Sequence, residues 1–195
     1  KQPVDILINE VFTTPKPPGN RQQPSNSRGE IRVQAINIDV ARKVLQTIDA
    51  GLVGGVGKPI PGQMCVEAAV CYALGLPHGD EPGCVSAAVR ALKIRLNDSN
   101  WSSPDARAKG LRRLGLAQLG SLGAVDDNEF RNRVVKLAIT TCVPQALRAA
   151  ASIHKDPKHQ AALVAAAKKC ESEANRSSSL EARDIARSAA DAADA

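Results

Sequence analysis

Aromatic residues are almost absent from this chain. Of its 195 residues, one is tryptophan, one is tyrosine and two are phenylalanine. A core without large rings must be filled by Ala, Leu, Val and Ile, and these residues favour close contact between helices over a sheet sandwich. The scarcity of aromatics also removes the stacking surfaces on which single-stranded nucleic acids are usually bound.

Long apolar runs are also missing. No stretch of about 18 apolar residues is present, so the sequence predicts no membrane span and no membrane partner. No basic-then-apolar start is present, so no signal peptide is predicted. The chain begins at Lys1 and ends within the repeat SAADAADA, which indicates a trimmed fragment in which missing targeting signals carry less weight.

Cysteine is present but does not form the pattern of a disulfide framework or a metal site. The five cysteines are an odd number, and most lie in apolar, helix-like runs, which predicts free thiols in a reducing, cytoplasmic compartment. Cys65, Cys71, His78 and Cys84 are spaced by six, seven and six residues, whereas zinc sites use close pairs. We therefore expect no metal and no cofactor.

A glycine-rich turn at residues 51–58 lacks the features of a phosphate-binding loop. That motif requires glycine at position 52, where Leu52 stands, and Ser or Thr after Lys58, where Pro59 stands. The turn also follows a helical pattern instead of a strand. We interpret it as a connection between two core helices.

What remains is a helical pattern over most of the chain. The sequence predicts a mainly α protein, a bundle of about eight helices with a solenoid-like middle as the alternative arrangement. Three segments are expected: an extended or β arm with a Pro/Gly/Ser-rich linker at 1–36, a helical domain at 37–176, and an alanine-rich, truncated C-terminal helix at 177–195. Helices are expected near residues 39–51, 62–75, 84–97, 103–120, 126–142, 143–154, 156–175 and 178–195.

Individual residues set several of these boundaries. Asp39 caps the first helix, whose apolar stripe includes Val40, Val44 and Ile48. Pro144 disfavours a helical Val143, so one helix is expected to end at Cys142. Trp101, in a polar turn, is expected to fill a helix corner and to need an acceptor for its indole N–H.

The helix predicted at 62–75 carries the first candidate site. Cys65 lies in its first turn, where a helix N-terminus lowers the pKa of a thiol and offers backbone N–H groups to an oxyanion. His78 is a candidate base for such a nucleophile, and Glu67 is a candidate acid, base or ligand. The alternative for Cys65 is a small core residue.

Glu67 is the one charged residue between Lys58 and Asp80, and its helical neighbours are apolar. Two readings follow from this. Glu67 pairs with an arginine or lysine of the middle helices and fixes their packing, or it faces a cleft and acts chemically.

The second candidate site is a basic surface. Residues 85–158 carry 13 basic and 6 acidic side chains, which makes them the most positive part of the chain. Such a surface suits nucleic acid or an acidic partner. The candidate residues are Arg90, Lys93, Arg95, Lys109, Arg112, Arg113, Arg131, Arg133 and Lys136.

Three functions follow from these patterns. The leading one is a non-enzymatic interaction or assembly protein whose partner is a protein, including a second copy of itself, because alanine-rich helix faces suit contacts between chains. The first alternative is a cysteine-dependent hydrolase that uses Cys65. The second is a nucleic-acid-binding helical protein that uses the basic residues between 90 and 136.

Overall fold

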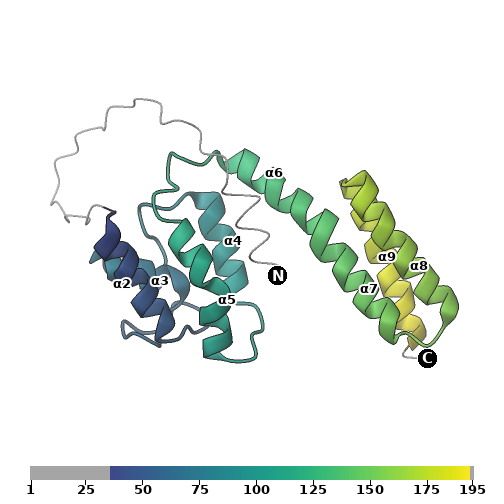
Figure 1. Cartoon of the computed structure of the whole chain (residues 1–195), viewed down its shortest axis with the longest axis horizontal. Helices are drawn as coiled ribbons and strands as arrows, with labels where there is room; N and C mark the ends of the chain where they lie inside the picture. Colours follow the sequence, from purple (N-terminus) through teal and green to yellow (C-terminus); the bar gives the residue numbers. More distant parts are fainter. Residues whose placement is uncertain (1–35, 194–195) are drawn as a thin grey trace. The chain divides into compact units, whose positions relative to one another are not determined.

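The computed structural model describes residues 36–193, and this part of the chain is mainly α-helical (Figure 1). It contains no strand, and its isolated β-bridge joins Gly57 to Met64. The predicted fold class, mainly α, is confirmed. The elements are α2 (Ile38–Asp49), α3 (Val66–Leu74), α4 (Ala87–Asn97), α5 (Pro104–Ala117), α6 (Asp127–Leu137), the π-helical turn η1 (Ala138–Cys142), α7 (Val143–Ile153), α8 (Pro157–Glu173) and α9 (Arg176–Ala193).

The predicted break before Pro144 is wrong. The chain passes from α6 through η1 into α7 without a gap, and Val143 keeps helical angles (φ −61°, ψ −50°). Pro144 lies in the first turn of α7, where a missing backbone N–H does little harm, and the wider π-turn before it accommodates the ring. Because α6, η1 and α7 can be counted as one continuous helix, the expected number of about eight helices is not confirmed. The predicted β arm falls on residues outside the described part.

The chain divides into two compact units at Phe130 and Arg131, within α6. We call residues 36–130 the first unit and residues 131–193 the second unit. The sequence analysis predicted no boundary here, although all 14 glycines of the chain lie at or before Gly123 and alanine is more frequent after residue 130. The segment boundaries expected at 36/37 and 176/177 are not tested by it and stay predictions.

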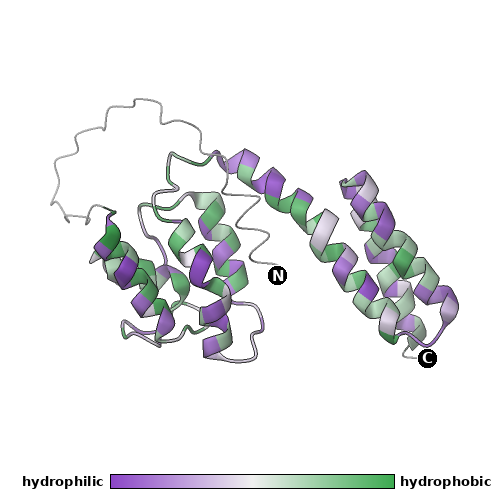
Figure 2. Cartoon of the chain, viewed as in Figure 1, coloured by the Kyte–Doolittle hydropathy of each residue, from purple (hydrophilic) through white to green (hydrophobic). Residues whose placement is uncertain are grey.

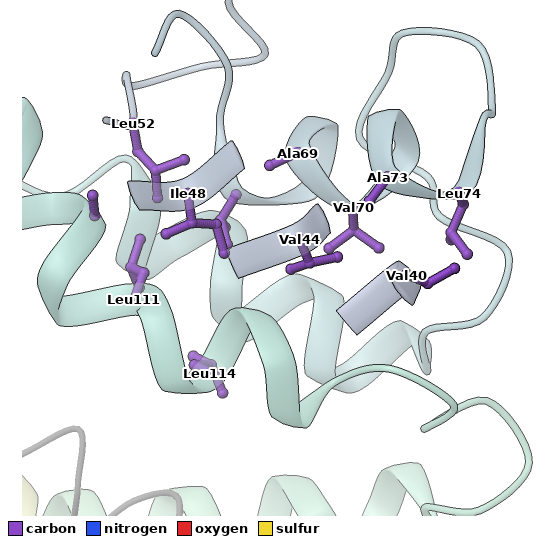
Figure 3. Packing of buried hydrophobic residues seen from close by; sticks show 12 residues of the cluster. Val40, Val44, Ile48, Leu52, Ala69, Val70, Ala73, Leu74, Leu111 and Leu114 are labelled. Atoms are coloured by element: carbon purple, nitrogen blue, oxygen red, sulfur yellow. The ribbon is translucent and has the colours of Figure 1, made fainter. Parts of the chain in front are cut away.

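The first unit packs α2, α3 and α5 around a core of branched side chains (Figure 3). Val40, Val44 and Ile48 recur every four residues along α2, are at most 2% exposed, and contact the apolar faces of the other two helices, as the predicted stripe requires. Gly115 lets α5 approach closely, since a Cβ there would lie 2.5 Å from Ile48 Cδ1. The result is a tightly packed three-helix contact, with α4 beside it.

Trp101 fills the corner before α5, as predicted. Its indole Nε1 donates a hydrogen bond to the carbonyl of Leu96 at 2.8 Å. Its ring lies against Gly110, where a Cβ would come within 2.3 Å of a ring carbon. The half-buried tryptophan thus connects the end of α4 to the outer side of the core.

The second unit packs α7, α8 and α9 with much smaller side chains. Five of the nine buried residues in its core are alanines, and the others include Leu163 and Cys170. Much of α8 and α9 is drawn in pale green, the colour of a modestly hydrophobic residue (Figure 2). Small faces bring helix backbones close together, which offsets the limited apolar area that each residue buries. Across residues 36–193, no helix combines the length and the apolar character needed to cross a membrane.

Candidate functional site

The helix α3 begins later than the sequence predicted, and this places Cys65 at its N-cap. The predicted start was Gly62, but residues 53–64 form a closed turn in which Val53 N–H donates to Met64 O and Lys58 N–H donates to Gln63 O. Gly57 and Gly62 take positive φ in this turn, and a Cβ on Gly57 would lie 2.0 Å from Gln63 O. The glycines are therefore needed for the turn that covers the start of α3.

Cys65 caps the helix with sulfur. Its Sγ accepts a hydrogen bond from the Ala68 N–H at 3.3 Å, and the side chain is 5% exposed. Burial raises the pKa of the Cys65 thiol, and the backbone N–H groups of Ala68 and Glu67 oppose that rise. The helix N-terminus thus supplies the predicted hydrogen bonding, but desolvation keeps the group a thiol at neutral pH.

Glu67 and Lys93 form an ion pair in the interior of the first unit. Lys93 Nζ on α4 lies 2.8 Å from Glu67 Oε1 on α3, and both side chains are 0% exposed. The structural reading of Glu67, a pair with a basic residue of the middle helices, is confirmed. The pair ties α3 to α4 in the interior of the first unit.

This ion pair lacks surrounding hydrogen bonds. Neither carboxylate oxygen of Glu67 nor Nζ of Lys93 has a hydrogen bond of acceptable angle among the described residues, even though the short Nζ–Oε1 approach makes a contact ion pair. Burial raises the pKa of Glu67 and lowers the pKa of Lys93, and each partner's charge opposes the shift of the other. Desolvation of two ions costs several kcal/mol each, roughly what their attraction returns.

A small cavity of about 60 Å³ lies beside the pair and the cap. Its lining includes side chains from α3, the end of α4 and the glycine turn: Val56, Cys65, Val66, Glu67, Asp80, Ile94, Asn97 and Asp98, with Gly55. Drug-sized ligands need several hundred Å³, so this cavity admits only molecules of a few atoms. Within residues 36–193, no group of three or more His, Cys, Asp or Glu side chains is placed to hold a metal ion.

Asn97 organises the wall of this cavity. Its Oδ1 accepts from the Val66 N–H at 3.2 Å, and its Nδ2 donates to Val53 O and to Asp98 Oδ1, each at 2.9 Å. Asp98 also accepts from the Gly55 N–H at 2.8 Å. The carboxamide therefore joins the start of α3, at the residue between Cys65 and Glu67, to the glycine turn.

His78 is not part of this arrangement. It is exposed, its Nε2 lies 3.1 Å from the carbonyl oxygen of Gly57, and it does not line the cavity. Of the three predicted catalytic residues, the structure brings Cys65 and Glu67 to one cavity and leaves His78 outside it. Sequence reasoning did not predict the backbone contacts of Asn97 and Asp98 in the cavity wall, although their position at a helix end just before a polar turn was a signal for hydrogen bonding to nearby backbone.

The predicted basic residues do not share one environment. Lys93 is buried against Glu67 and does not reach the surface. Arg90 pairs with Asp80 at 2.9 Å, and Arg112 pairs with Asp49 at 2.6 Å, so these two cations are partly neutralised by local acids. Arg95 and Lys109 are exposed on the first unit, as is Lys136 on the second. Nucleic-acid binding by the remaining residues stays a prediction.

An open groove of about 650 Å³ runs between α7 and α8 in the second unit. Its lining is mostly small and apolar with a polar margin: Arg148, Ala151, Ser152, Pro157, Gln160, Ala161, Val164, Ala165 and Lys168. α9 contacts α7 and α8 but contributes no residue to this lining. The groove is therefore a face of the helix pair that α9 does not cover.

Comparisons of this chain with protein-family models, with curated proteins and with solved structures find no significant match.

Proposed function

We propose that this protein is a non-enzymatic assembly protein that self-associates through the α7/α8 groove. The observation that carries the proposal is the groove itself, an open strip of alanines and a valine with cations at its margin. Its occupant is α9 of a second copy, and the partner's groove receives α9 of the first copy in return. An exchange of this kind closes into a symmetric pair, the commonest form of soluble oligomer.

The shape of the groove favours a helix with small side chains. Ala161 and Ala165 lie one turn apart on α8 and are exposed, so a second helix can approach the α8 backbone closely. The side of α9 that carries Asp184 and Asp191 also carries the small, exposed Ser188, beside the larger Arg187. Small faces that meet each other pack without cavities and bury both backbones.

Charge complementarity supports the same occupant. Among residues 36–193, Lys168 at the groove and Asp191 on the exposed side of α9 each have no ion-pair partner. Asp184 lies seven residues before Asp191, so both point to one side of the helix. Arg148 adds a second cation at the groove, where it is balanced in part by Glu171 at 2.7 Å.

The test is the mass of the protein in solution over a range of concentrations, measured by light scattering. We expect the mass of two chains at micromolar concentration and a single chain after Ala165→Glu, which places a charge on the groove. The matched control is Ala149→Glu, an exposed alanine of α7 that does not line the groove and whose variant should stay dimeric. A single chain at every concentration, with normal helical circular dichroism, overturns the proposal.

A charge exchange identifies the occupant. Lys168→Glu and Asp191→Lys should each weaken the dimer, and the two changes together should restore it, because the pair is then re-formed with reversed signs. Arg95→Glu in the first unit makes the same change of charge away from the groove and should have no effect. A dimer that responds to Ala165→Glu but shows no restoration in the double variant would mean that another surface fills the groove.

A further inference from the structure

The connection between α7 and α8 is closed by one histidine. His154 follows the last residue of α7, and both nitrogens of its half-buried ring are engaged. Its Nε2 lies 3.0 Å from the carbonyl oxygen of Ala189 on α9, and its Nδ1 accepts a hydrogen bond from the Asp156 N–H at 3.1 Å. The backbone carbonyl of His154 accepts from Gln160 Nε2 on α8 at 2.6 Å. This residue therefore joins all three helices of the second unit.

These contacts admit one protonation state of the ring. A carbonyl oxygen can only accept a hydrogen bond, so Nε2 of His154 carries a proton. A backbone N–H can only donate, so Nδ1 keeps its free electron pair. The bonded ring is therefore neutral, and a second proton can enter only at Nδ1, where it would meet the Asp156 N–H directly.

We propose that His154 is a pH-sensitive switch at one end of the α7/α8 groove. The neutral ring holds the connection closed. Protonation of Nδ1 releases the Asp156 N–H, while the bond to Ala189 stays, because Nε2–H is a donor in both states. Histidine is the side chain that changes charge in mildly acidic solution. The opening of the connection is independent of self-association, whereas its effect on assembly rests on the proposed function.

The other charged groups around the ring do not change which bond is lost. The last turn of α7 carries none, and the remaining elements contribute Lys155 and Asp156 in the connection, Lys158 and His159 on α8, and Arg187 and Asp191 beside Ala189 on α9. The ring of His159 lies 5.0 Å from that of His154 between centroids, and its Nε2 lies 3.7 Å from Asp156 Oδ2. The carboxylates and the C-terminal ends of α7 and α9 favour a charged ring, and the cations oppose it. None of these groups can keep the Asp156 N–H contact, because a protonated Nδ1 has no electron pair to offer.

The switch acts on residues that line the groove. Pro157, Gln160 and Ala161 belong to the beginning of α8 and border the groove. Asp156 is the N-cap of that helix, and its Oδ1 accepts from the Lys158 N–H at 2.8 Å. Releasing the backbone of the cap residue loosens the first turn of α8. The groove therefore loses its fixed shape at this end when the ring is charged.

The first test measures the Asp156 amide and the His154 ring by NMR at about pH 7.5 and about pH 5. At the higher pH the ring nitrogen signals should show a proton on Nε2 and none on Nδ1. At the lower pH the protection of the Asp156 amide from exchange with water, corrected for the intrinsic pH dependence, should fall about five- to tenfold. A ring that stays neutral at the lower pH, or an amide that stays equally protected beside a charged ring, overturns the proposal.

Two variants hold the connection in one state each. His154→Gln keeps a donor that reaches the Ala189 carbonyl but has no acceptor at the position of Nδ1, so the Asp156 amide should be open at both pH values. His154→Asn places an amide oxygen at the position of Nδ1, so the amide should stay protected at both. His78→Gln changes an exposed histidine of the first unit and should keep the native response. A pH response of the Asp156 amide that survives in both His154 variants assigns it to another group and overturns the proposal.

The effect on assembly is measured separately, as the mass of the protein in solution at the same two pH values. We expect the dissociation constant of the native dimer to rise about five- to tenfold in acid and that of His154→Asn to stay the same. A native dimer that is equally tight at both pH values, although the Asp156 amide opens, overturns the effect on the groove. A single chain at both pH values overturns the proposed function instead, and the amide measurement still decides whether His154 is a switch.

Discussion

The two units solve the same packing problem with different side chains. The first unit buries Val, Ile and Leu around α2, α3 and α5 and adds one ion pair in its interior, whereas the second unit packs mostly alanine. Branched side chains bury more apolar area for each residue and depend on precise fit, while alanine faces depend on close backbones and good helices. Stability in the first unit should therefore be concentrated in a few residues, and in the second it should be spread over many.

The two candidate sites lie in different units, and each follows from the side chains of its unit. The buried pair and the cavity occur where the first unit departs from a purely apolar core, at Glu67 and Lys93. The groove occurs where the second unit has too little side-chain volume to close its own surface. One site is a small cavity beside a buried ion pair, and the other is an open groove on the surface.

The largest effect is expected from breaking the ion pair on one side. Lys93→Met leaves Glu67 buried without a counter-ion and should reduce the stability of the first unit by about 3–5 kcal/mol. Glu67→Gln/Lys93→Met removes both charges and should cost far less. Denaturant unfolding followed by the fluorescence of Trp101, the one tryptophan in the chain, reports on the first unit.

The outcome of that pair of variants separates packing from ionic stabilisation. If the double variant loses as much stability as Lys93→Met, the pair itself is a major source of stability, and the uncompensated charge is not the cause. Far-ultraviolet circular dichroism should show that the helices of the second unit melt independently of the change.

A pH effect of similar size should appear in the first unit. Burial raises the pKa of the Cys71 thiol to about 11 from a usual value of 9.0, with the charge of Glu67 as a second cause. Between these values the unfolded chain loses the thiol proton and the native state keeps it, so stability falls as pH rises from about 9 to about 11. Two pH units correspond to about 3 kcal/mol.

The measurement is Trp101-detected unfolding at pH 8.5 and pH 11, repeated in Cys71→Ala. The alanine variant should lose the part of the pH dependence that is due to the thiol, although other groups that titrate near pH 10 remain. An identical pH profile in the two proteins would contradict the assigned shift.

The sequence was sufficient for the fold class and for some contacts. The stripe at Val40, Val44 and Ile48 follows from helical periodicity, and the pairing of Glu67 follows because a lone charge in an apolar helix needs a partner. The sequence did not identify Lys93 as the partner, because nothing distinguishes it from the other cations of a basic segment. The cavity could not be predicted either, because it depends on how the glycine turn folds over the start of α3.

Other features were missed because distant residues determine them. The π-turn before Pro144 lets the helix continue where local rules predict an end. The division at residue 130 lies inside a helix, and helix signals carry no information about which side of a helix packs with which neighbour. Self-association stays a proposal, because a single sequence cannot place two surfaces together.

A smaller effect should follow from adding one methyl group between α5 and α2. In Gly115→Ala the new Cβ would lie 2.5 Å from Ile48 Cδ1 and 3.2 Å from Val66 Cγ2, so the helices must move apart or Ile48 must change rotamer. We expect a loss of about 1–3 kcal/mol in Trp101-detected unfolding, despite the better helix propensity of alanine. Ile48→Val/Gly115→Ala should recover part of the loss. A stabilised single variant would show that the core of the first unit is looser than the branched packing implies.

The smallest effect compares two helix ends that have the same backbone conformation. α3 ends at Gly75 with φ 70°, and α8 ends at Ala174 with φ 50°, and the N–H of each residue donates back to a carbonyl of its own helix. The left-handed conformation costs an L-residue about 1 kcal/mol. Gly75→Ala should therefore destabilise the first unit by about 1 kcal/mol, since a Cβ there meets no neighbour and only the backbone is strained.

Ala174→Gly should stabilise the second unit by up to about 1 kcal/mol, measured as a rise in the thermal midpoint by circular dichroism. If Ala174→Gly is destabilising, the flexibility of glycine outweighs the relief of strain, and the alanine at this end is one of the many small contributions on which the second unit depends.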